Sequence, residues 1–408
     1  MRRLLAGARL FTGDRMLDGH ALLTEGERIT AVLPVSEAPA DVQVRRLPAD
    51  TLLVPGFLDV QVNGAGGVLF NDTPTAEAAL AIAAVVRRTG TTGILPTFMT
   101  DERDKMRQAC DAAVQALAHP RGGVRGLHLE GPFLAVERPG VHPPEWIRRP
   151  DAEDIDALVA LATDRIAPSG RLLLTVAPET IDDRDIERLA AAGVTVAAGH
   201  TAATVERTCQ ALAAGLRGFT HLFNAMPPLV NRHPGPVAAA LADPDAWCSI
   251  IADGHHVHPA LLRLLVHIKP QGKVILVTDA MPPSGTDATS FNLFGRTVLR
   301  HDGRLATEDG TLAGADIDMA TSVRNCVDLL GLPLEESLRM ASLYPARYIG
   351  LDRELGSLTP GHRADLTLLR PDLTVLATWV AGEEEWYGRD GEGDGEGEGH
   401  GEGRGNAP

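Results

Sequence analysis

The feature that most constrains this fold is a repeated alternation of apolar segments and helical patterns across residues 51–280. Helical patterns such as AEAALAIAAVVRRTG and ERLAAAG separate most of the apolar segments. Because strands that alternate with helices build parallel sheets covered on both faces, the pattern indicates an α/β fold. Eight strand–helix units in about 300 residues fit a closed (β/α)8 TIM-like barrel, with a doubly wound open sheet as the alternative. The eight segments are, in order, TLLVPGFLDVQVNG, TGILPTF, VRGLHLEG, LLLTVAPE, VTVAAGH, GFTHLFNA, CSIIADGHH and KVILVTDA.

Both ends of the chain show a different sequence pattern, that of short β-strands separated by Gly, Asp and Pro. It is seen in ARLFTG and ALLTEGERITAVLP near the start and in GSLTPGHRADLTLLRPDLTVLATWVAGEE near the end. We therefore expect a small sheet domain built from residues 1–53 and 352–388, around a barrel formed by residues 54–351. The tail, residues 389–408, alternates Gly with Glu and cannot bury apolar surface, so we expect it to be a disordered acidic tail.

Charge and cysteine usage limit the partners and the compartment. A net charge of −16 argues against nucleic acid or an anionic membrane as the main partner, because both need a basic surface. Four cysteines without a CxxC motif fit a reducing compartment. The N-terminus is too quickly polar for a signal peptide, and no stretch approaches the roughly 18 apolar residues of a membrane span. These features predict a cytoplasmic protein.

Polar or ionisable residues follow almost every predicted strand. In a (β/α)8 barrel the carboxyl ends of all strands meet at one rim, which is where active sites lie. We therefore expect these side chains to form one metal and acid–base site. They are Glu130, Glu179, His200, His221, Asp253 and Asp279.

Three of these residues make a plausible set of metal ligands. Glu130, His200 and His221 form a two-His, one-carboxylate set, a common arrangement for catalytic zinc that leaves room for a water. A lone His is more often a satisfied buried residue, but three ligands at strand ends of one barrel favour one divalent metal ion. Zinc is expected, and iron, cobalt or nickel also suit imidazole. On the first strand, DVQVNG places Gln61 and Asn63 where many barrel hydrolases have His-x-His, and amides bind divalent cations poorly.

The remaining candidates supply acid–base chemistry and substrate binding. Asp279, at the end of the eighth strand, could take a proton from a water and pass it to a leaving amine. The alternative for Asp279 is an ion-paired structural carboxylate. His142, in the loop after the third strand, could donate to the oxygen of a scissile carbonyl. His128 either faces the same side as Glu130 or points away from it, and the sequence leaves this open.

An anionic substrate group is indicated by basic residues at the same rim. Arg232 and His256 follow the sixth and seventh strands, beside the backbone of Asn224 and Ala225. Arg pairs with phosphate in a bidentate manner, and backbone N–H groups add further donors. The chain has no GxGxxG, GxxxxGK[ST] or GxSxG motif, so nucleotide cofactors and a serine nucleophile have no support.

Together, the motifs PGFLDVQVNGAGG, GLHLEGPF, AGHTAAT, THLFNAM, IADGHHVHP, LVTDAMPPSG, GTLAGADIDM and ASLYPARYIG resemble one family. It is the N-acetylglucosamine-6-phosphate deacetylase family of the amidohydrolase superfamily, and the resemblance runs from about residue 8 to residue 382. It implies a (β/α)8 barrel with a small β-sandwich from both termini. It also implies removal of acetate from N-acetylglucosamine 6-phosphate to give glucosamine 6-phosphate, in amino-sugar catabolism or cell-wall recycling.

The resemblance also assigns roles to residues of this chain. Family members that carry Gln-x-Asn on the first strand, as Gln61 and Asn63 here, use one metal ion. Members are usually homodimers, in some of which the phosphate is reached from the neighbouring subunit. The implied metal ligands are Glu130, His200 and His221, with Asp279 as the acid–base group and His142 polarising the acetyl carbonyl. The implied substrate-binding residues are Asn224, Ala225, Arg232 and His256 at the phosphate, and Leu312, Ala313 and Gly314 at the acetamide.

Two other functions are compatible with this pattern. Another amidohydrolase chemistry, such as cyclic-amide hydrolysis or deamination, predicts a carboxylated Lys or extra His ligands at the rim. The strand ends offer no suitably placed Lys, because Lys273 begins a strand. A non-catalytic sugar-phosphate binder would be favoured by the loss of Asp279 or of the metal ligands, and all of these are present.

Overall fold

The centre of the molecule is a parallel sheet of eight strands whose spatial order follows the chain. The computed structural model describes residues 2–388, so the predicted tail lies outside the described residues. A parallel bridge joins Val62 to Ala280, and the Asp279 N–H donates to the Gln61 carbonyl at 3.0 Å, which nearly closes the sheet into a barrel. The predicted (β/α)8 barrel is therefore confirmed. Its strands are β8 (Phe57–Val62), β11 (Thr91–Met99), β12 (Gly126–Glu130), β13 (Arg171–Val176), β14 (Thr195–Ala198), β15 (Gly218–Phe219), β16 (Trp247–Ile250) and β17 (Val274–Leu276).

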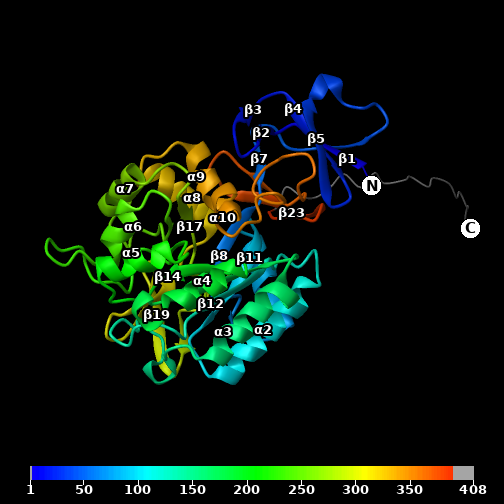
Figure 1. The fold of residues 1–408 in the computed structure, drawn as a ribbon. Helices are drawn as coiled ribbons and strands as arrows, with labels where there is room; N and C mark the ends of the chain where they lie inside the picture. Colours follow the sequence, from blue (N-terminus) through cyan, green and yellow to red (C-terminus); the bar gives the residue numbers. More distant parts are fainter. Residues whose placement is uncertain (1, 389–408) are drawn as a thin grey trace, which may run out of the picture.

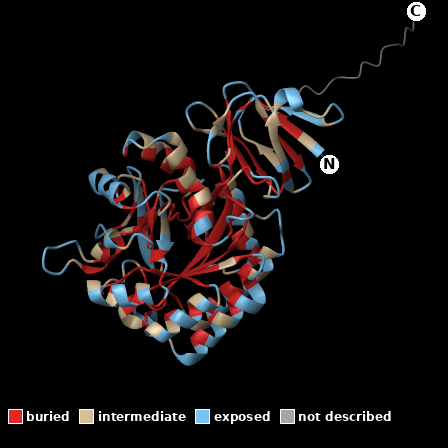
Figure 2. Ribbon diagram, turned by 45° about the horizontal axis from the view of Figure 1, so that its top comes forward, coloured by how far each residue is buried: buried red, intermediate tan, exposed pale blue. Residues whose placement is uncertain are grey.

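Helices surround the barrel and bury one face each against it, while their outer faces are exposed (Figure 2). In the first helix, Ala79, Ile82 and Val86 recur at helical spacing and lie in the main core, and Thr75 caps the helix by accepting from the Ala78 N–H. The helices are α1 (Ala76–Arg87), α2 (Arg103–Leu117), α3 (Ala152–Ala160), α4 (Asp183–Ala191), α5 (Val205–Ala213), α6 (Gly235–Ala242), α7 (Pro259–Ile268), α8 (Met319–Asp328), α9 (Leu334–Ala341) and α10 (Leu343–Tyr348). Shorter helical segments are Val35–Glu37, Pro144–Trp146, Leu161–Ile166 and Pro178–Thr180.

A second, smaller unit combines strands from both ends of the chain, seen as blue and red ribbons side by side in Figure 1. Leu5 and Leu22 of one sheet and Leu53, Leu366 and Trp379 of the other share a hydrophobic cluster, so the two sheets pack as a sandwich. The four-stranded sheet contains β1 (Arg2–Ala6), β4 (His20–Glu25), β5 (Arg28–Pro34) and β6 (Gln43–Arg46). The six-stranded sheet contains β2 (Arg9–Phe11), β3 (Met16–Leu17), β7 (Leu52–Pro55), β22 (Leu366–Leu369), β23 (Val375–Val380) and β24 (Glu383–Trp386).

The first apolar segment differs from the sequence prediction, because it forms two strands instead of one. Its first half, β7, pairs with β2 and β22 in the small domain, and its second half, β8, enters the barrel. The chain passes from one sheet to the other at Gly56, where a Cβ atom would lie 2.0 Å from the Thr92 hydroxyl. A residue without a side chain is needed at this crossing.

An additional antiparallel sheet follows the eighth barrel strand and was not predicted. Leu293, Val298, Leu305 and Ala313 of this sheet pack against Met281 of the barrel rim. The sheet therefore holds its last strand and the residues just before it against the carboxyl ends of the barrel strands. Its strands are β18 (Ser290–Leu293), β19 (Arg296–His301), β20 (Arg304–Thr307) and β21 (Leu312–Ala315). A small ribbon of β9 (Gly64–Ala65) and β10 (Val68–Leu69) contributes Leu69 to the same cluster.

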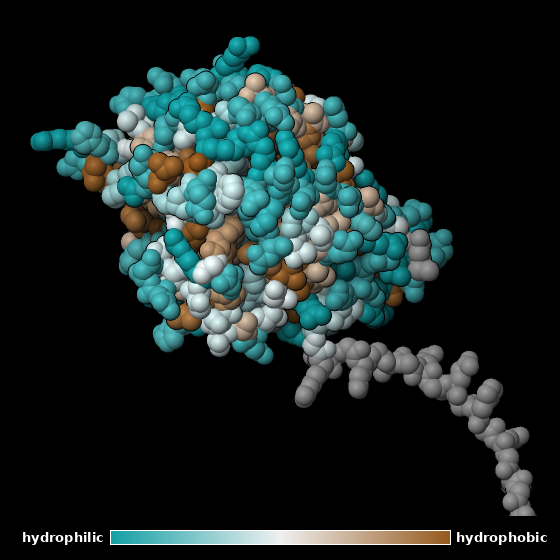
Figure 3. Space-filling view, turned by 90° about the horizontal axis from the view of Figure 1, so that it is seen from below, coloured by the Kyte–Doolittle hydropathy of each residue, from teal (hydrophilic) through white to brown (hydrophobic). Residues whose placement is uncertain are grey.

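The surface is mainly polar. Figure 3 shows apolar side chains as separate patches among hydrophilic ones on the face viewed from below. Within residues 2–388, no helix has both the length and the apolar character that a membrane crossing requires.

Candidate active site

A cavity of about 490 Å³ opens at the carboxyl ends of the barrel strands and brings most of the predicted site residues together. Arg232 and Ala313 do not line it: Arg232 is exposed, and Ala313 is buried beneath the wall. The predicted residues that line it are Glu130, His142, His200, His221, Asn224, Ala225, His256, Asp279, Leu312 and Gly314.

Several of these residues have an unusual backbone conformation. His200, His221 and Asp279 have positive φ values of 49°, 31° and 52°, and Ala225 has 51°. Left-handed backbone is uncommon outside glycine and costs free energy, so the surrounding structure must enforce it. Three barrel strands, β14, β15 and β17, are thus followed by a turn in which a predicted site residue is presented to the cavity. Such strain is typical of active sites.

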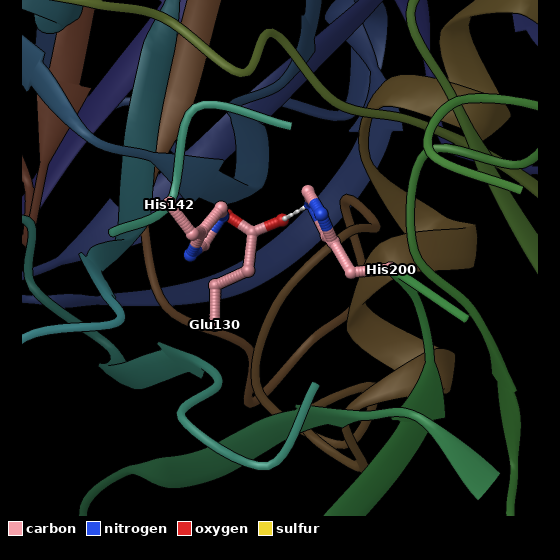
Figure 4. A group of neighbouring side chains, drawn as sticks. All are labelled: Glu130, His142 and His200. Carbon is pink, nitrogen blue, oxygen red and sulfur yellow. Dashed lines mark ion pairs between the residues drawn. The ribbon is translucent and has the colours of Figure 1, made fainter. Parts of the chain in front are cut away.

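Glu130 lies at the centre of the site, at the end of β12. Its Oε1 is 2.9 Å from His221 Nε2 and 3.3 Å from His200 Nε2, and its Oε2 is 3.9 Å from His142 Nε2. Figure 4 shows the imidazoles of His142 and His200 on either side of the carboxylate. One ligand atom from each of Glu130, His142 and His200 lies within 4.8 Å of the others, and all three residues are buried. This cluster indicates a divalent metal site.

The hydrogen bonds of the His200 ring fit a metal ligand, and the His221 ring presents one nitrogen to the same carboxylate. Nδ1 of His200 is 3.0 Å from the carbonyl oxygen of Arg138, so Nδ1 carries the proton and the lone pair of Nε2 faces Glu130. A backbone partner that fixes the ring in this tautomer is typical of histidines that bind metals. His221 also presents Nε2 to Glu130, and its Nδ1 has no hydrogen-bond partner within residues 2–388. The donor set of Glu130, His200 and His221 therefore suits zinc and similar divalent ions.

His142 is arranged differently, as a neutral donor. The Thr100 N–H donates to its Nδ1 at 3.3 Å, so the proton of the ring lies on Nε2, which is directed toward the Glu130 carboxylate. Burial, together with the nearby His200, lowers the pKa of His142 to about 3. A neutral imidazole with Nε2–H at the cavity wall can donate to a carbonyl oxygen, as predicted for this residue.

Asp279 is held by two amides on the first barrel strand. Its Oδ1 accepts from Asn63 Nδ2 at 2.7 Å and from Gln61 Nε2 at 3.1 Å, and Gln61 Nε2 also lies 3.2 Å from Glu130 Oε1. Burial and the charge of Glu130 raise the pKa of Asp279 to about 6. A carboxylate that exchanges its proton near neutral pH is suited to acid–base chemistry. Its side-chain partners within residues 2–388 are these two amides and no Lys or Arg, so an ion-paired structural role has no support.

The sequence had identified Gln61 and Asn63 only as poor metal ligands. The structure shows them as donors that orient Asp279, a contact made because β8 meets the end of β17 where the barrel closes. Their side-chain oxygens, Gln61 Oε1 and Asn63 Oδ1, are buried without a hydrogen-bond partner among residues 2–388. Alternation along β8 from Gln61 also places Asp59 on the same face, where it accepts from the Thr278 N–H and hydroxyl.

His256 also lines the cavity, together with Asn224 and Ala225. Its Nδ1 is 2.6 Å from Asp253 Oδ2. The segment before β21 contributes Thr311 next to Leu312 and Gly314. The sequence placed Asp253 among the rim residues of the site, and the structure shows that it contacts His256 without lining the cavity itself. Thr311 was not predicted.

Two residues near the rim belong to the structural framework. Glu179 accepts from the Thr201 hydroxyl and the Ala202 N–H, both at 2.6 Å, and does not line the cavity. The expectation that it joins the site is therefore wrong. His128 faces the barrel interior between the hydroxyls of Thr97 and Thr175, at 3.2 and 2.8 Å, and burial lowers its pKa to about 4. It is a satisfied, neutral core histidine on the layer below Glu130.

Comparisons with known proteins agree with this site. The model of the amidohydrolase family matches residues 52–384, and the model of the NagA composite domain matches residues 4–50. A N-acetylgalactosamine-6-phosphate deacetylase from Shewanella sp. (strain ANA-3) is 40% identical over 92% of this chain and 94% of its own length. A N-acetylglucosamine-6-phosphate deacetylase from Haemophilus influenzae is 34% identical over 94% of this chain and 99% of its own.

Solved structures show the same architecture. The crystal structure of N-acetylglucosamine-6-phosphate deacetylase from Pasteurella multocida is 37% identical, covers 95% of this chain and 100% of its own, and superposes with a TM-score of 0.90. A mutant of the Mycobacterium smegmatis enzyme, solved in complex with N-acetyl-D-glucosamine-6-phosphate, is 34% identical over 94% of this chain and 99% of its own, with a TM-score of 0.84. With both its domains matched in order, this chain belongs to the amidohydrolase family, in the group that carries the NagA composite domain.

Proposed function

We propose that this protein is a metal-dependent deacetylase that converts N-acetylglucosamine 6-phosphate and water to glucosamine 6-phosphate and acetate. The observation that carries the proposal is the convergence of three features in one cavity: Glu130 between the Nε2 atoms of His200 and His221, a neutral donor, His142, and a carboxylate that can exchange protons, Asp279. The names of relatives at 34–40% identity support a substrate of the N-acetylhexosamine 6-phosphate class.

Glu130, His200 and His221 would hold one divalent ion, zinc first, which supplies the Lewis acidity that amide hydrolysis needs at neutral pH. Asp279 takes a proton from the attacking water and delivers it to the nitrogen as the C–N bond breaks. His142 donates its Nε2–H to the carbonyl oxygen as negative charge develops there. Water thus adds to the acetyl carbon, acetate leaves, and the nitrogen becomes the free amine.

The rest of the cavity would orient the sugar. Asn224, His256 and the backbone at Ala225 would bind the 6-phosphate, and Leu312 and Gly314 would contact the acetamide. This placement is supported by their shared position on the cavity wall. Binding energy from the remote phosphate would fix the reacting amide in place, so its loss should lower kcat/KM.

The oligomeric state and the location are also part of the proposal. Arg232 is exposed and lies outside the cavity wall, next to Leu229 and Val230, whose exposures are 53% and 46%. An exposed basic residue beside exposed apolar ones supports a homodimer in which Arg232 of a second copy completes the phosphate site. Four free cysteines support a cytoplasmic location.

A second substrate, N-acetylgalactosamine 6-phosphate, is favoured by one specific observation. The relative at 40% identity carries that activity in its name, whereas the proteins from Haemophilus influenzae and Pasteurella multocida, named as N-acetylglucosamine-6-phosphate deacetylases, are 34% and 37% identical. The two sugars differ only in the configuration at C4. Both belong to the same reaction class and need the same metal and acid–base groups.

The test is acetate release by zinc-reconstituted protein from both sugar phosphates and from unphosphorylated N-acetylglucosamine. We expect kcat/KM to be at least a hundredfold higher for N-acetylglucosamine 6-phosphate than for the unphosphorylated sugar, or roughly 2.7 kcal/mol of transition-state binding. A higher value on the galactosamine compound would reassign the sugar and keep the reaction. Equal rates with and without phosphate would remove the phosphate site, and no acetate from any of the three would overturn the proposed function.

A further inference from the structure

Asp253 and His256 form a closed pair in the turn between β16 and α7. Asp253 Oδ1 accepts from the backbone N–H groups of His255 and His256, both at 2.9 Å, and its Oδ2 lies 2.6 Å from His256 Nδ1. The two side chains are only 4% and 6% exposed. One carboxylate therefore shapes the turn and fixes the imidazole that the turn presents.

The geometry leaves the other edge of the His256 ring free for a ligand. His256 lines the cavity, whereas Asp253 does not. Nδ1 faces the carboxylate, and the only side-chain hydrogen bond of His256 within residues 2–388 is this one. Because the carboxylate accepts the Nδ1 proton, it fixes the ring orientation and directs Nε2 away from Asp253.

The carboxylate is well suited to this task. Burial alone would raise the pKa of Asp253, but the hydrogen bond and the charge of His256 outweigh it and lower this pKa. Helix α8 also holds the turn, because Asn325 on this helix donates to the Ala252 carbonyl at 2.7 Å. The His256 ring is therefore positioned before any ligand binds.

We propose that Asp253 is a positioning residue that acts through His256, fixing its imidazole and supplying the negative charge that strengthens the donation from Nε2 to the 6-phosphate of the substrate. This inference rests on the proposed function, because it assumes that His256 meets the phosphate. It predicts that substrate affinity depends on a carboxylate that touches neither the substrate nor the reacting amide.

The experiment is a double-mutant cycle with Asp253→Asn, His256→Gln and the double variant, all reconstituted with zinc. Asn keeps an oxygen for the two backbone N–H groups and removes the charge, and Asp253→Ser does the same if the Asn variant folds poorly. Three quantities are measured: kcat and KM for the sugar phosphate, and the dissociation constant of glucosamine 6-phosphate by calorimetry. Asp245→Asn is the matched control, because Asp245 is an exposed acid at the opposite end of β16.

We expect Asp253→Asn to raise KM and the dissociation constant about tenfold, with kcat changed less than threefold. In the His256→Gln background, Asp253→Asn should change KM and the dissociation constant less than twofold, because the partner of Asp253 is already gone. An equal effect in both backgrounds, or a fall in kcat at constant KM, would overturn the inference while leaving the deacetylase activity in place. Failure of the unmodified protein to bind glucosamine 6-phosphate would instead overturn the proposed function, and this inference with it.

Discussion

The two ends of the barrel both carry buried charge, but they use it differently. At the amino end, basic residues that precede or begin strands are bound to fixed protein groups. Arg125 pairs with Asp365 at 2.7 Å, Arg171 donates to the Gly350 carbonyl at 2.8 Å, and Lys273 donates to a main-chain carbonyl at 2.9 Å. These contacts tie the barrel to the small domain, to the end of α10 and to the loop before β16.

At the amino end, Arg125 Nε is also buried without a partner among residues 2–388, but more such atoms lie at the carboxyl end. Gln61 Oε1, Asn63 Oδ1 and His221 Nδ1 are buried without hydrogen-bond partners among residues 2–388, and several neighbouring residues have strained backbone. The amino end has the larger cavity, about 610 Å³ against 490 Å³. Cavity size therefore does not identify the active site. His221, which lines the smaller cavity and has an unpartnered Nδ1, is a more specific indication of the site.

Buried aspartates show the contrast most clearly. Asp365 is fully buried, but Arg125 and Arg363 outweigh the effect of burial and lower its pKa. Asp279 and Asp59 lie near the carboxyl end without a cationic Arg or Lys, and burial raises their pKa values to about 6 and about 7. A paired carboxylate contributes to stability, whereas an unpaired one is available to exchange protons.

The largest expected effect is that of Asp279→Asn. The amide cannot accept a proton from water, so kcat/KM should fall by about a thousandfold, within the usual range for loss of an acid–base group. Because the substitution removes an uncompensated buried charge, the melting temperature should stay constant or rise. Acetate release and thermal unfolding of the same samples measure both quantities, with Asp245→Asn as the control for the loss of an acid. Activity within tenfold of the unmodified protein would mean that Asp279 is structural.

At the amino end the opposite outcome is expected, a loss of stability with activity kept. Arg125→Met leaves Asp365 with only Arg363, whose Nε is 3.4 Å away, in place of the 2.7 Å contact. Breaking a buried pair costs about 3–5 kcal/mol, and we expect about 3 because one partner remains. The free energy of unfolding in urea and kcat/KM at 25 °C test this. A tenfold loss of kcat/KM with little loss of stability would abolish the distinction between the two ends.

Much of this arrangement follows from the sequence, for a physical reason. Parallel strands bring their carboxyl ends to one rim, so ionisable residues at the ends of apolar segments could be expected to meet. Glu130, His200, His221 and Asp279 do so. The same logic failed for Glu179, because its position at a strand end does not show that its carboxylate turns back to Thr201 and the backbone.

Other parts depend on contacts that no local pattern records. The sheet of β18–β21 has short strands with many exposed residues, so it leaves no apolar segment to detect. The donation from Gln61 and Asn63 to Asp279 exists only because the first and last barrel strands meet. Arg232 illustrates the limit of a single chain, since its predicted role requires a second copy.

A smaller effect concerns the pH dependence of stability. The pKa of Asp59 is about 7 in the folded protein and about 4 when unfolded, so unfolding releases a proton between these values. Stability from this group therefore falls as the pH rises from 4 to 7 and is constant above 7. For Asp365, whose folded pKa is lowered, the contribution is present above about pH 4 and is lost as the pH falls.

Asp59→Asn isolates the first of these effects. With the metal removed by a chelator, the melting temperature of the variant relative to the unmodified protein should rise by a few degrees from pH 5 to pH 8. Thermal unfolding at the two pH values measures it. A difference that does not change with pH would show that Asp59 is already ionised at pH 5, and hence that this end of the barrel compensates its buried charges after all.

The most direct test of the central claim, that the carboxyl rim holds one catalytic metal ion, is a zinc titration of the metal-free protein. Acetate release from N-acetylglucosamine 6-phosphate would be followed as zinc is added in steps, with the bound metal counted by elemental analysis. Glu130, His200 and His221 form one set of metal ligands, and the amides of Gln61 and Asn63 take the place of a second set. Activity should therefore rise in proportion to the zinc added and level off at one equivalent per chain. Full activity without metal, or a plateau reached only at two equivalents, would contradict the account.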